Sequence, residues 1–124
     1  MPTAKKILLI DDEKDFLSLL KDALEIRGFE AIAVDNAVEA GMELASKAPD
    51  LILMDIKMPG IDGLQACGAI KRNPDTAHIP IIVVSALSDE PVRKEAQKLG
   101  VAEYFVKPID IEQLIGKIKD VLKK

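Results

Sequence analysis

The feature that most constrains the fold is an alternation, repeated five times, of a short apolar run with a longer amphipathic segment. Each run has the length of a strand, and the segment after it places apolar residues at helical spacing. Strands are expected over 6–10, 31–34, 51–54, 81–84 and 102–106. Because the runs are apolar throughout, both faces of each strand should be buried, which is typical of a parallel sheet covered by helices on both sides.

The segments between the runs carry signals for where helices begin and end. Helices are expected over 13–27, from Asn36 to before Pro49, from Asp62 to Asn73, over 90–99, and from Asp110 to Leu122. Asn or Asp stands at three of the N-terminal cap positions, and Gly28 and Gly100 follow two of the helices. In the second helix the apolar positions are Val38, Met42, Leu44 and Ala45.

Five strand–helix units with right-handed crossovers predict a doubly wound α/β sheet, in one domain that covers residues 1–124. The segment Met58-Pro59-Gly60 predicts a turn after the third strand. Gly60 and Gly63 are interpreted as residues that give this loop backbone freedom. In such sheets the ligand binds beyond the carboxyl ends of the strands.

Polar residues follow four of the five strands at that edge. Asp11 and Asp12 follow the first strand, Asp55 the third, Ser85 the fourth and Lys107 the fifth. The fold would bring these distant positions together, and three neighbouring carboxylates would repel one another. Proton uptake or a bound divalent cation relieves such repulsion, and ligands that are all oxygen suit Mg²⁺.

This set of residues favours phosphoryl chemistry. A carboxylate can act as a nucleophile and form an aspartyl phosphate. The transferred group needs positive charge on its equatorial oxygens, which a metal ion and Lys107 can supply. The hydroxyl of Ser85 can hydrogen-bond a phosphoryl oxygen.

With these residues, the sequence closely resembles the receiver domain of bacterial response regulators over essentially the whole chain. The resemblance rests on Asp11-Asp12, the segment from Asp55 to Gly63, Ser85-Ala86 and Tyr104-Phe105-Val106-Lys107-Pro108. Four such pieces in register over five strand–helix units are far more specific than any one of them alone.

The resemblance implies a flavodoxin-like fold with five helices and strand order 2-1-3-4-5, and a role for each site residue. Asp55 would be the phosphoacceptor, and Lys107 would pair with the phosphoryl group. Mg²⁺ would be bound directly by Asp12, by Asp55 and by the backbone carbonyl of Lys57. Asp11 would act on the metal mainly through water.

The resemblance also implies a switch. Ser85 would move toward the phosphoryl group and leave space into which Tyr104 turns, so the surface of the fourth helix, fifth strand and fifth helix would change. The bond between Lys107 and Pro108 is expected to be cis.

The function implied is that of a phosphorelay response regulator. The phosphoryl donor would be a sensor histidine kinase or a histidine phosphotransfer protein, and the output would pass to an effector protein or a covalently linked output domain. The chain would be a signalling switch that catalyses only its own phosphotransfer and dephosphorylation, as a monomer or a phosphorylation-dependent homodimer.

Composition argues against other partners. The chain has 17 basic and 21 acidic residues and only 3% aromatic residues, so direct nucleic-acid binding is not expected. It has one cysteine and no apolar stretch that approaches the length of a signal peptide or a membrane span. A cytoplasmic location without membrane contact is therefore predicted.

Three alternatives compete with this hypothesis. A phosphatase of the haloacid-dehalogenase type would need an Asp-x-Asp pattern and a cap domain, but the first strand ends in Asp11-Asp12-Glu13. A flavodoxin-like FMN carrier would need a hydroxyl-rich or glycine-rich phosphate loop there. The remaining alternative is a receiver-like scaffold that works without phosphorylation, which would have no need of Asp55 or Lys107.

Overall fold

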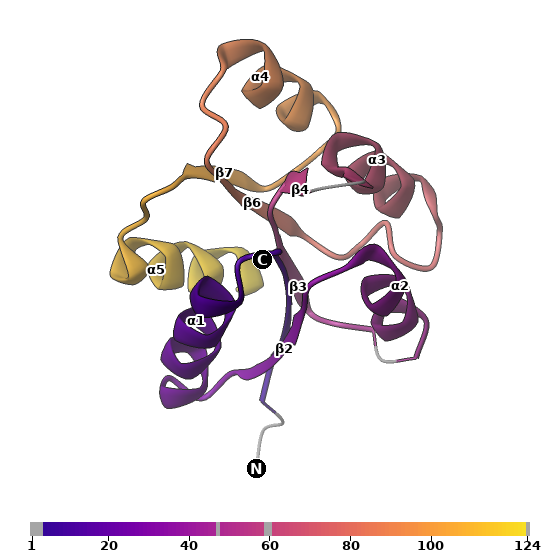
Figure 1. Ribbon diagram of the computed structural model, residues 1–124. Coiled ribbons are helices and arrows are strands. Elements are labelled where there is room, and N and C mark those ends of the chain that lie inside the picture. The colour runs from indigo at the N-terminus through magenta and orange to yellow at the C-terminus, as the bar shows by residue number, and fades with distance from the viewer. Residues whose placement is uncertain (1–3, 47, 59–60, 124) are drawn as a thin grey trace.

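Figure 1 shows the computed structural model, which describes residues 4–46, 48–58 and 61–123. In chain order its elements are β1 (Lys6–Ile10), α1 (Lys14–Ile26), β2 (Glu30–Val34), α2 (Ala37–Ser46), β3 (Leu51–Met54), β4 (Lys57–Met58), β5 (Ile61–Asp62), α3 (Gly63–Arg72), β6 (Ile81–Ser85), α4 (Glu90–Lys98), β7 (Glu103–Val106) and α5 (Ile111–Leu122). All five predicted strands and all five predicted helices are confirmed, with small shifts at their ends of the kind that helix fraying produces.

The main sheet has five strands in the order β2-β1-β3-β6-β7, and every neighbouring pair is parallel. Numbered among themselves these strands follow the order 2-1-3-4-5, so the flavodoxin-like topology is confirmed. The hairpin of β4 and β5, a separate antiparallel pair, was not predicted. Its strands have two residues each, too few to show any periodicity. The expected turn at Pro59 and Gly60 lies outside the described residues.

The sheet separates two hydrophobic cores, and successive residues of a strand point into opposite ones. Ile7 and Leu9 of β1 join the core under α1 and α5, whereas Leu8 and Ile10 join the core under α2, α3 and α4. These helices lie on the corresponding sides of the sheet in Figure 1. All four side chains are at most 3% exposed, which confirms that the strands are buried on both faces.

Helix α2 buries less of its apolar surface than its sequence suggests. Val38 is 73% and Met42 65% exposed, although both are large apolar residues. They lie four residues apart, so they share one face of the helix. The side chains of α2 that reach the core are those of Ala40, which is buried, and Leu44, which is partly buried. Their apolar character therefore does not indicate the buried face of this short helix.

The predicted helix ends are confirmed by local geometry. The side chains of Asn36, Asp62 and Asp110 each accept hydrogen bonds from backbone N–H groups in the first turn of the helix that follows. Gly28 and Gly100 have φ angles of +91° and +95°, values at which a side chain would be strained. These caps fix where the chain leaves each helix to enter the next strand.

Gly63 is required for close packing rather than for the backbone freedom that was expected of it. It is buried at the start of α3, and a Cβ atom there would lie 2.3 Å from the Cα of Ile56. This position requires a missing side chain because two backbone segments approach each other closely. The contact holds the loop after Asp55 against the first turn of α3.

We predict that Gly63→Ala destabilises the protein. The new methyl group would overlap backbone atoms of Ile56 that cannot move aside easily, so the free energy of unfolding should fall by about 1–3 kcal/mol. Gly41→Ala is the matched control, because nothing lies within 4 Å of a Cβ at that position in α2. That substitution should raise the free energy of unfolding by up to about 1 kcal/mol. Urea denaturation measures both, and equal midpoints for Gly63→Ala and wild type would refute the close contact.

Candidate functional site

The parallel hydrogen-bond ladder brings the first carboxylates of the site together. In its register Ile10 of β1 lies opposite Met54 of β3. The ladder continues one residue further, because the N–H of Asp55 donates to the carbonyl of Ile10 at 2.9 Å. Asp11 and Asp55 therefore leave adjacent strands at the same level of the sheet.

The other half of the site is positioned in the same way. Ser85 is the last residue of β6 and lies opposite Val106 of β7. The N–H of Lys107 donates to the carbonyl of Ser85 at 2.8 Å. The cis peptide bond expected between Lys107 and Pro108 is confirmed. The four strands thus deliver their terminal polar residues to one edge.

Three carboxylates form a cluster at this edge. Asp11, Asp12 and Asp55 each offer an oxygen, and these three oxygens lie within 4.8 Å of one another. Asp11 and Asp55 are only 3% and 5% exposed, whereas Asp12 faces solvent. The cluster therefore has a buried floor and an open side, and its all-oxygen donor set fits a hard divalent cation.

The positive charge of Lys107 compensates part of the negative charge of the cluster. Its Nζ donates to Asp11 Oδ2 at 2.8 Å, to Glu13 Oε1 at 2.7 Å and to Asp55 Oδ2 at 3.3 Å. Its ammonium group also lies 4.4 Å from the centroid of the Phe16 ring. The three donors of this ammonium thus meet three carboxylates, and the longest contact is the one to Asp55.

Burial and charge act against each other on the two strongly paired groups. Burial raises the pKa of Asp11 above its ordinary value, and the hydrogen bonds from Lys107 and from the Glu13 N–H offset this only in part. Burial alone would lower the pKa of Lys107, but its hydrogen bonds to Asp11 and Glu13 and the charges of Asp11 and Asp55 outweigh it and raise that pKa. Lys107 therefore stays charged, and the ionised form of Asp11 is the strained partner.

Ser85 and Tyr104 are linked through the backbone of one residue. Ser85 is fully buried, and its Oγ accepts a hydrogen bond from the N–H of Leu87 at 3.2 Å. The hydroxyl of Tyr104 donates to the carbonyl of Leu87 at 2.7 Å. Burial raises the pKa of this hydroxyl. Ser85 and Tyr104, the two residues expected to form a switch, thus bind the N–H and the carbonyl of the same residue, Leu87.

Lys57, Glu13 and Phe16 also lie at the site, whereas Cys67 is a core residue. Lys57 lies at the start of β4, and its N–H donates to Asp55 Oδ1 at 2.8 Å. Glu13 and Phe16 were not predicted as partners of Lys107. Glu13 directly follows the acidic pair and could have been suspected, whereas nothing in the spacing of Phe16 indicated its place beside Lys107. Cys67 is buried, and burial raises the pKa of its thiol to about 11, in agreement with an unreactive core residue.

Comparison with known proteins agrees with this geometry. The response regulator receiver domain family matches residues 7–119. The chain belongs to this family. Receiver domains are signalling switches of two-component systems. Membership of this family therefore points to a signalling role for the acidic cluster at the sheet edge.

Individual relatives of this receiver-family chain differ in length. It is 32% identical over 120 residues to the phosphate regulon transcriptional regulatory protein PhoB of Pseudomonas aeruginosa, which covers 97% of this chain and 52% of PhoB. It is 34% identical over 119 residues to the polar-differentiation response regulator DivK of Brucella anthropi, which covers 95% of this chain and 96% of DivK. The chain therefore spans about half the length of the first relative and nearly all of the second.

A solved structure of the phosphorylated cyanobacterial phytochrome response regulator RcpA is similar to this receiver-family chain, with a TM-score of 0.81 and 30% sequence identity. The similarity covers 95% of this chain and 91% of that one. Within the described part of the chain, no helix combines the length and apolar character that crossing a bilayer requires.

We predict that Asp11→Asn raises the free energy of unfolding at neutral pH in metal-free protein. Burial raises the folded-state pKa of Asp11 above its ordinary value of 3.8, so the folded state binds this proton more tightly than the unfolded state. The penalty for ionisation is absent below pH 3.8 and is complete once the pH exceeds the folded-state pKa. The stability advantage of the variant should therefore grow as the pH rises through this range, even though it loses the ion pair with Lys107.

Denaturation with a chelator present, repeated from acid to neutral pH, measures this difference between variant and wild type. Asp22→Asn, at an exposed position of α1, is the control and should show no such growth. A stability difference for Asp11→Asn that stays constant or shrinks toward neutral pH would show that the ion pair outweighs burial.

Proposed function

We propose that residues 1–124 form the receiver domain of a phosphorelay response regulator in which Asp55 accepts a phosphoryl group. The donor would be the phosphohistidine of a sensor histidine kinase or of a histidine phosphotransfer protein. The observation that carries the proposal is the position of Asp55, buried between Asp11 and Lys107 and within 4.8 Å of two other carboxylates. Membership of the receiver family supports it.

Asp55 is the best placed of the three carboxylates to act as nucleophile. Both oxygens of Asp11 are engaged, one by the Glu13 N–H at 2.9 Å and the other by Lys107 at 2.8 Å. Oδ1 of Asp55 is held by the Lys57 N–H, whereas among the described residues its Oδ2 has only the 3.3 Å contact with Lys107. Asp55 therefore combines a fixed orientation with one loosely held oxygen that can attack.

The cluster fits Mg²⁺ because every donor is an oxygen and the charges of its carboxylates need compensation. Asp12, Asp55 and the backbone carbonyl of Lys57 would hold the ion directly, and Asp11 would act mainly through water. When bound, the ion would supply positive charge beside the oxygens of the transferring phosphoryl group.

The proposed transfer moves one phosphoryl group without a net redox change. An oxygen of Asp55 attacks phosphorus, the bond from phosphorus to the donor imidazole nitrogen breaks, and the electron pair returns to that nitrogen. Lys107 would donate a hydrogen bond to one phosphoryl oxygen, with the donor that now makes the long 3.3 Å contact with Asp55. The hydroxyl of Ser85, which lies at the end of the next strand, would meet another.

The output would follow from the link between Ser85 and Tyr104. Recruitment of the Ser85 hydroxyl by the phosphoryl group would disturb its bond from Leu87, and Tyr104 holds the carbonyl of that same residue. A change there would reach the surface of α4, β7 and α5, where an effector protein or a linked output domain would bind. The phosphorylated state named for RcpA supports phosphorylation as the trigger.

The setting proposed for this switch follows the family. The lengths of PhoB and DivK are compatible with a linked output domain and with a free-standing receiver, respectively. We propose a cytoplasmic protein, monomeric or dimerising on phosphorylation, which binds neither nucleic acid nor membrane directly through this domain. A phosphorylation-independent scaffold is the alternative, but the buried ion pairs that Lys107 makes with Asp11 and Asp55 argue for a working site.

Incubation with a small-molecule phosphoryl donor tests the proposal. Wild-type protein should gain the mass of one phosphoryl group when Mg²⁺ is present and none when it is chelated, and Asp55→Asn should gain none. Asp62→Asn removes an exposed carboxylate from the same loop and should be phosphorylated like wild type. No mass gain in folded wild-type protein would favour the scaffold.

Magnesium should also stabilise the unphosphorylated fold, because a ligand that binds only the folded state raises its stability. At an Mg²⁺ concentration of 100 times the dissociation constant the gain is about 2.7 kcal/mol. Asp12→Asn should lose most of this gain, whereas Asp22→Asn should retain it. Thermal melting with and without Mg²⁺ measures the effect, and an equal rise in Tm for Asp12→Asn and wild type would exclude Asp12 as a ligand.

A further inference from the structure

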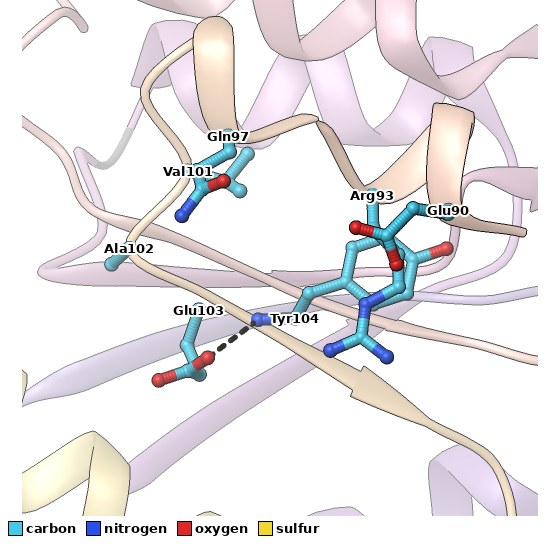
Figure 2. Close-up of a pocket in the computed structure, with 7 residues that line it drawn as sticks. All are labelled: Glu90, Arg93, Gln97, Val101, Ala102, Glu103 and Tyr104. Atoms are coloured by element: carbon cyan, nitrogen blue, oxygen red, sulfur yellow. Dashed lines mark hydrogen bonds between the residues drawn. The ribbon is translucent and has the colours of Figure 1, made fainter. Parts of the chain in front are cut away.

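The ring of Tyr104 is covered by a cation from the neighbouring helix. The guanidinium carbon of Arg93, on α4, lies 5.4 Å from the centroid of the Tyr104 ring, on β7. Figure 2 shows the Arg93 side chain extending from the helix across the face of this ring. A cation in this position is attracted by the electrons of the ring face.

Tyr104 lies beside open space. A cavity of about 310 Å³ is lined by Glu90, Arg93, Gln97, Val101, Ala102, Glu103 and Tyr104 (Figure 2). A ring next to such a cavity can leave its position without displacing a packed core. The ring also packs against the core, and the covering guanidinium and the hydroxyl contact with Leu87 add to the interactions that hold its present position.

The backbone of Tyr104 is held more firmly than its ring. Its N–H donates to the carboxylate of Glu103 at 3.2 Å, which Figure 2 marks, and Glu103 forms an ion pair with Lys117 of α5 at 3.1 Å. The residue is also paired with Val83 in the sheet. These contacts favour a rotation of the side chain over a displacement of the strand.

We propose that Arg93 is a positioning residue of the switch, whose guanidinium keeps the Tyr104 hydroxyl on the Leu87 carbonyl. Arg93 thereby links α4 to Leu87, whose carbonyl accepts from Tyr104 and whose N–H donates to Ser85 Oγ. The contact between Arg93 and Tyr104 exists without phosphorylation, whereas its regulatory meaning rests on the proposed function of Asp55.

The size of the effect follows from the strength of such contacts at partly exposed sites. Loss of the guanidinium should lower the ratio of covered to open Tyr104 rings by about two- to five-fold. Besides burial, the negative charges of Asp55 and Asp89 raise the pKa of the Tyr104 hydroxyl, so the variants must leave both carboxylates unchanged.

Tyrosine fluorescence measures this ratio directly, because Tyr104 is the only tyrosine and the chain has no tryptophan. Acrylamide quenching reports how open the ring is to solvent. Arg93→Ala should increase the quenching constant, Arg93→Met should do so nearly as much, and Arg93→Lys should restore part of the protection. Lys94→Ala, at the next exposed position of α4, is the control and should match wild type.

Equal quenching of Arg93→Ala and wild type would overturn the proposal. Wild-type protection in Arg93→Met, or none restored in Arg93→Lys, would also overturn it, because the cover would then not depend on the cation. Circular dichroism must show that each variant is folded.

The same variants test the regulatory half after treatment with a small-molecule phosphoryl donor and Mg²⁺. In the proposed switch, phosphorylation turns the Tyr104 ring inward, into the space that Ser85 leaves. The gain in protection should be larger in Arg93→Ala than in wild type, because more rings start open to solvent in the variant. An equal change in both proteins would refute a role for Arg93 in the switch. If wild type gains no phosphoryl mass, the proposed function fails, while the quenching comparison of unphosphorylated proteins still decides the contact.

Discussion

The parallel register of the central strands is the constraint on which the rest of this protein depends. Because Ile10 lies opposite Met54, and Ser85 opposite Val106, the residues that follow emerge at one level of the sheet. A shift of one residue in any of these strands would reverse which side chains face each core. The two cores therefore stabilise the site geometry along with the fold, and the site needs no long loop to assemble it.

Electrostatic strain is concentrated at this edge and balanced there. Asp11 and Asp55 are buried beside each other with their negative charges directed at one ammonium, that of Lys107. Such a cluster lowers stability unless a bound cation compensates its charge, since buried like charges repel. Glu13, whose side chain is 61% exposed, also forms an ion pair with Lys107. It holds the ammonium from the solvent side without adding to the buried charge.

Sequence patterns were sufficient for the strands, the helices and the meeting of polar residues at one sheet edge, because these depend on period and position. The strand order came from the family resemblance. Apolar runs gave the strands, caps gave the helix ends, and the strand ends indicated which polar residues meet. The patterns failed where a contact depends on three-dimensional approach alone. The closeness of Gly63 to Ile56, the cover of Arg93 on Tyr104 and the solvent exposure of Val38 leave no signature in spacing or composition.

The proposed chemistry and the proposed switch lie in parts of the sheet that differ in burial. β3, which directly precedes Asp55, is central and entirely buried, whereas β7 is an edge strand whose residues are all only partly buried. Catalytic geometry requires a fixed carboxylate, and a switch requires a side chain that can change position with little disturbance of the core. Ser85 ends β6, the strand between them, and is paired with Val106 of β7. A change at the buried centre can thus reach the more exposed edge through a single strand pairing and the backbone of Leu87.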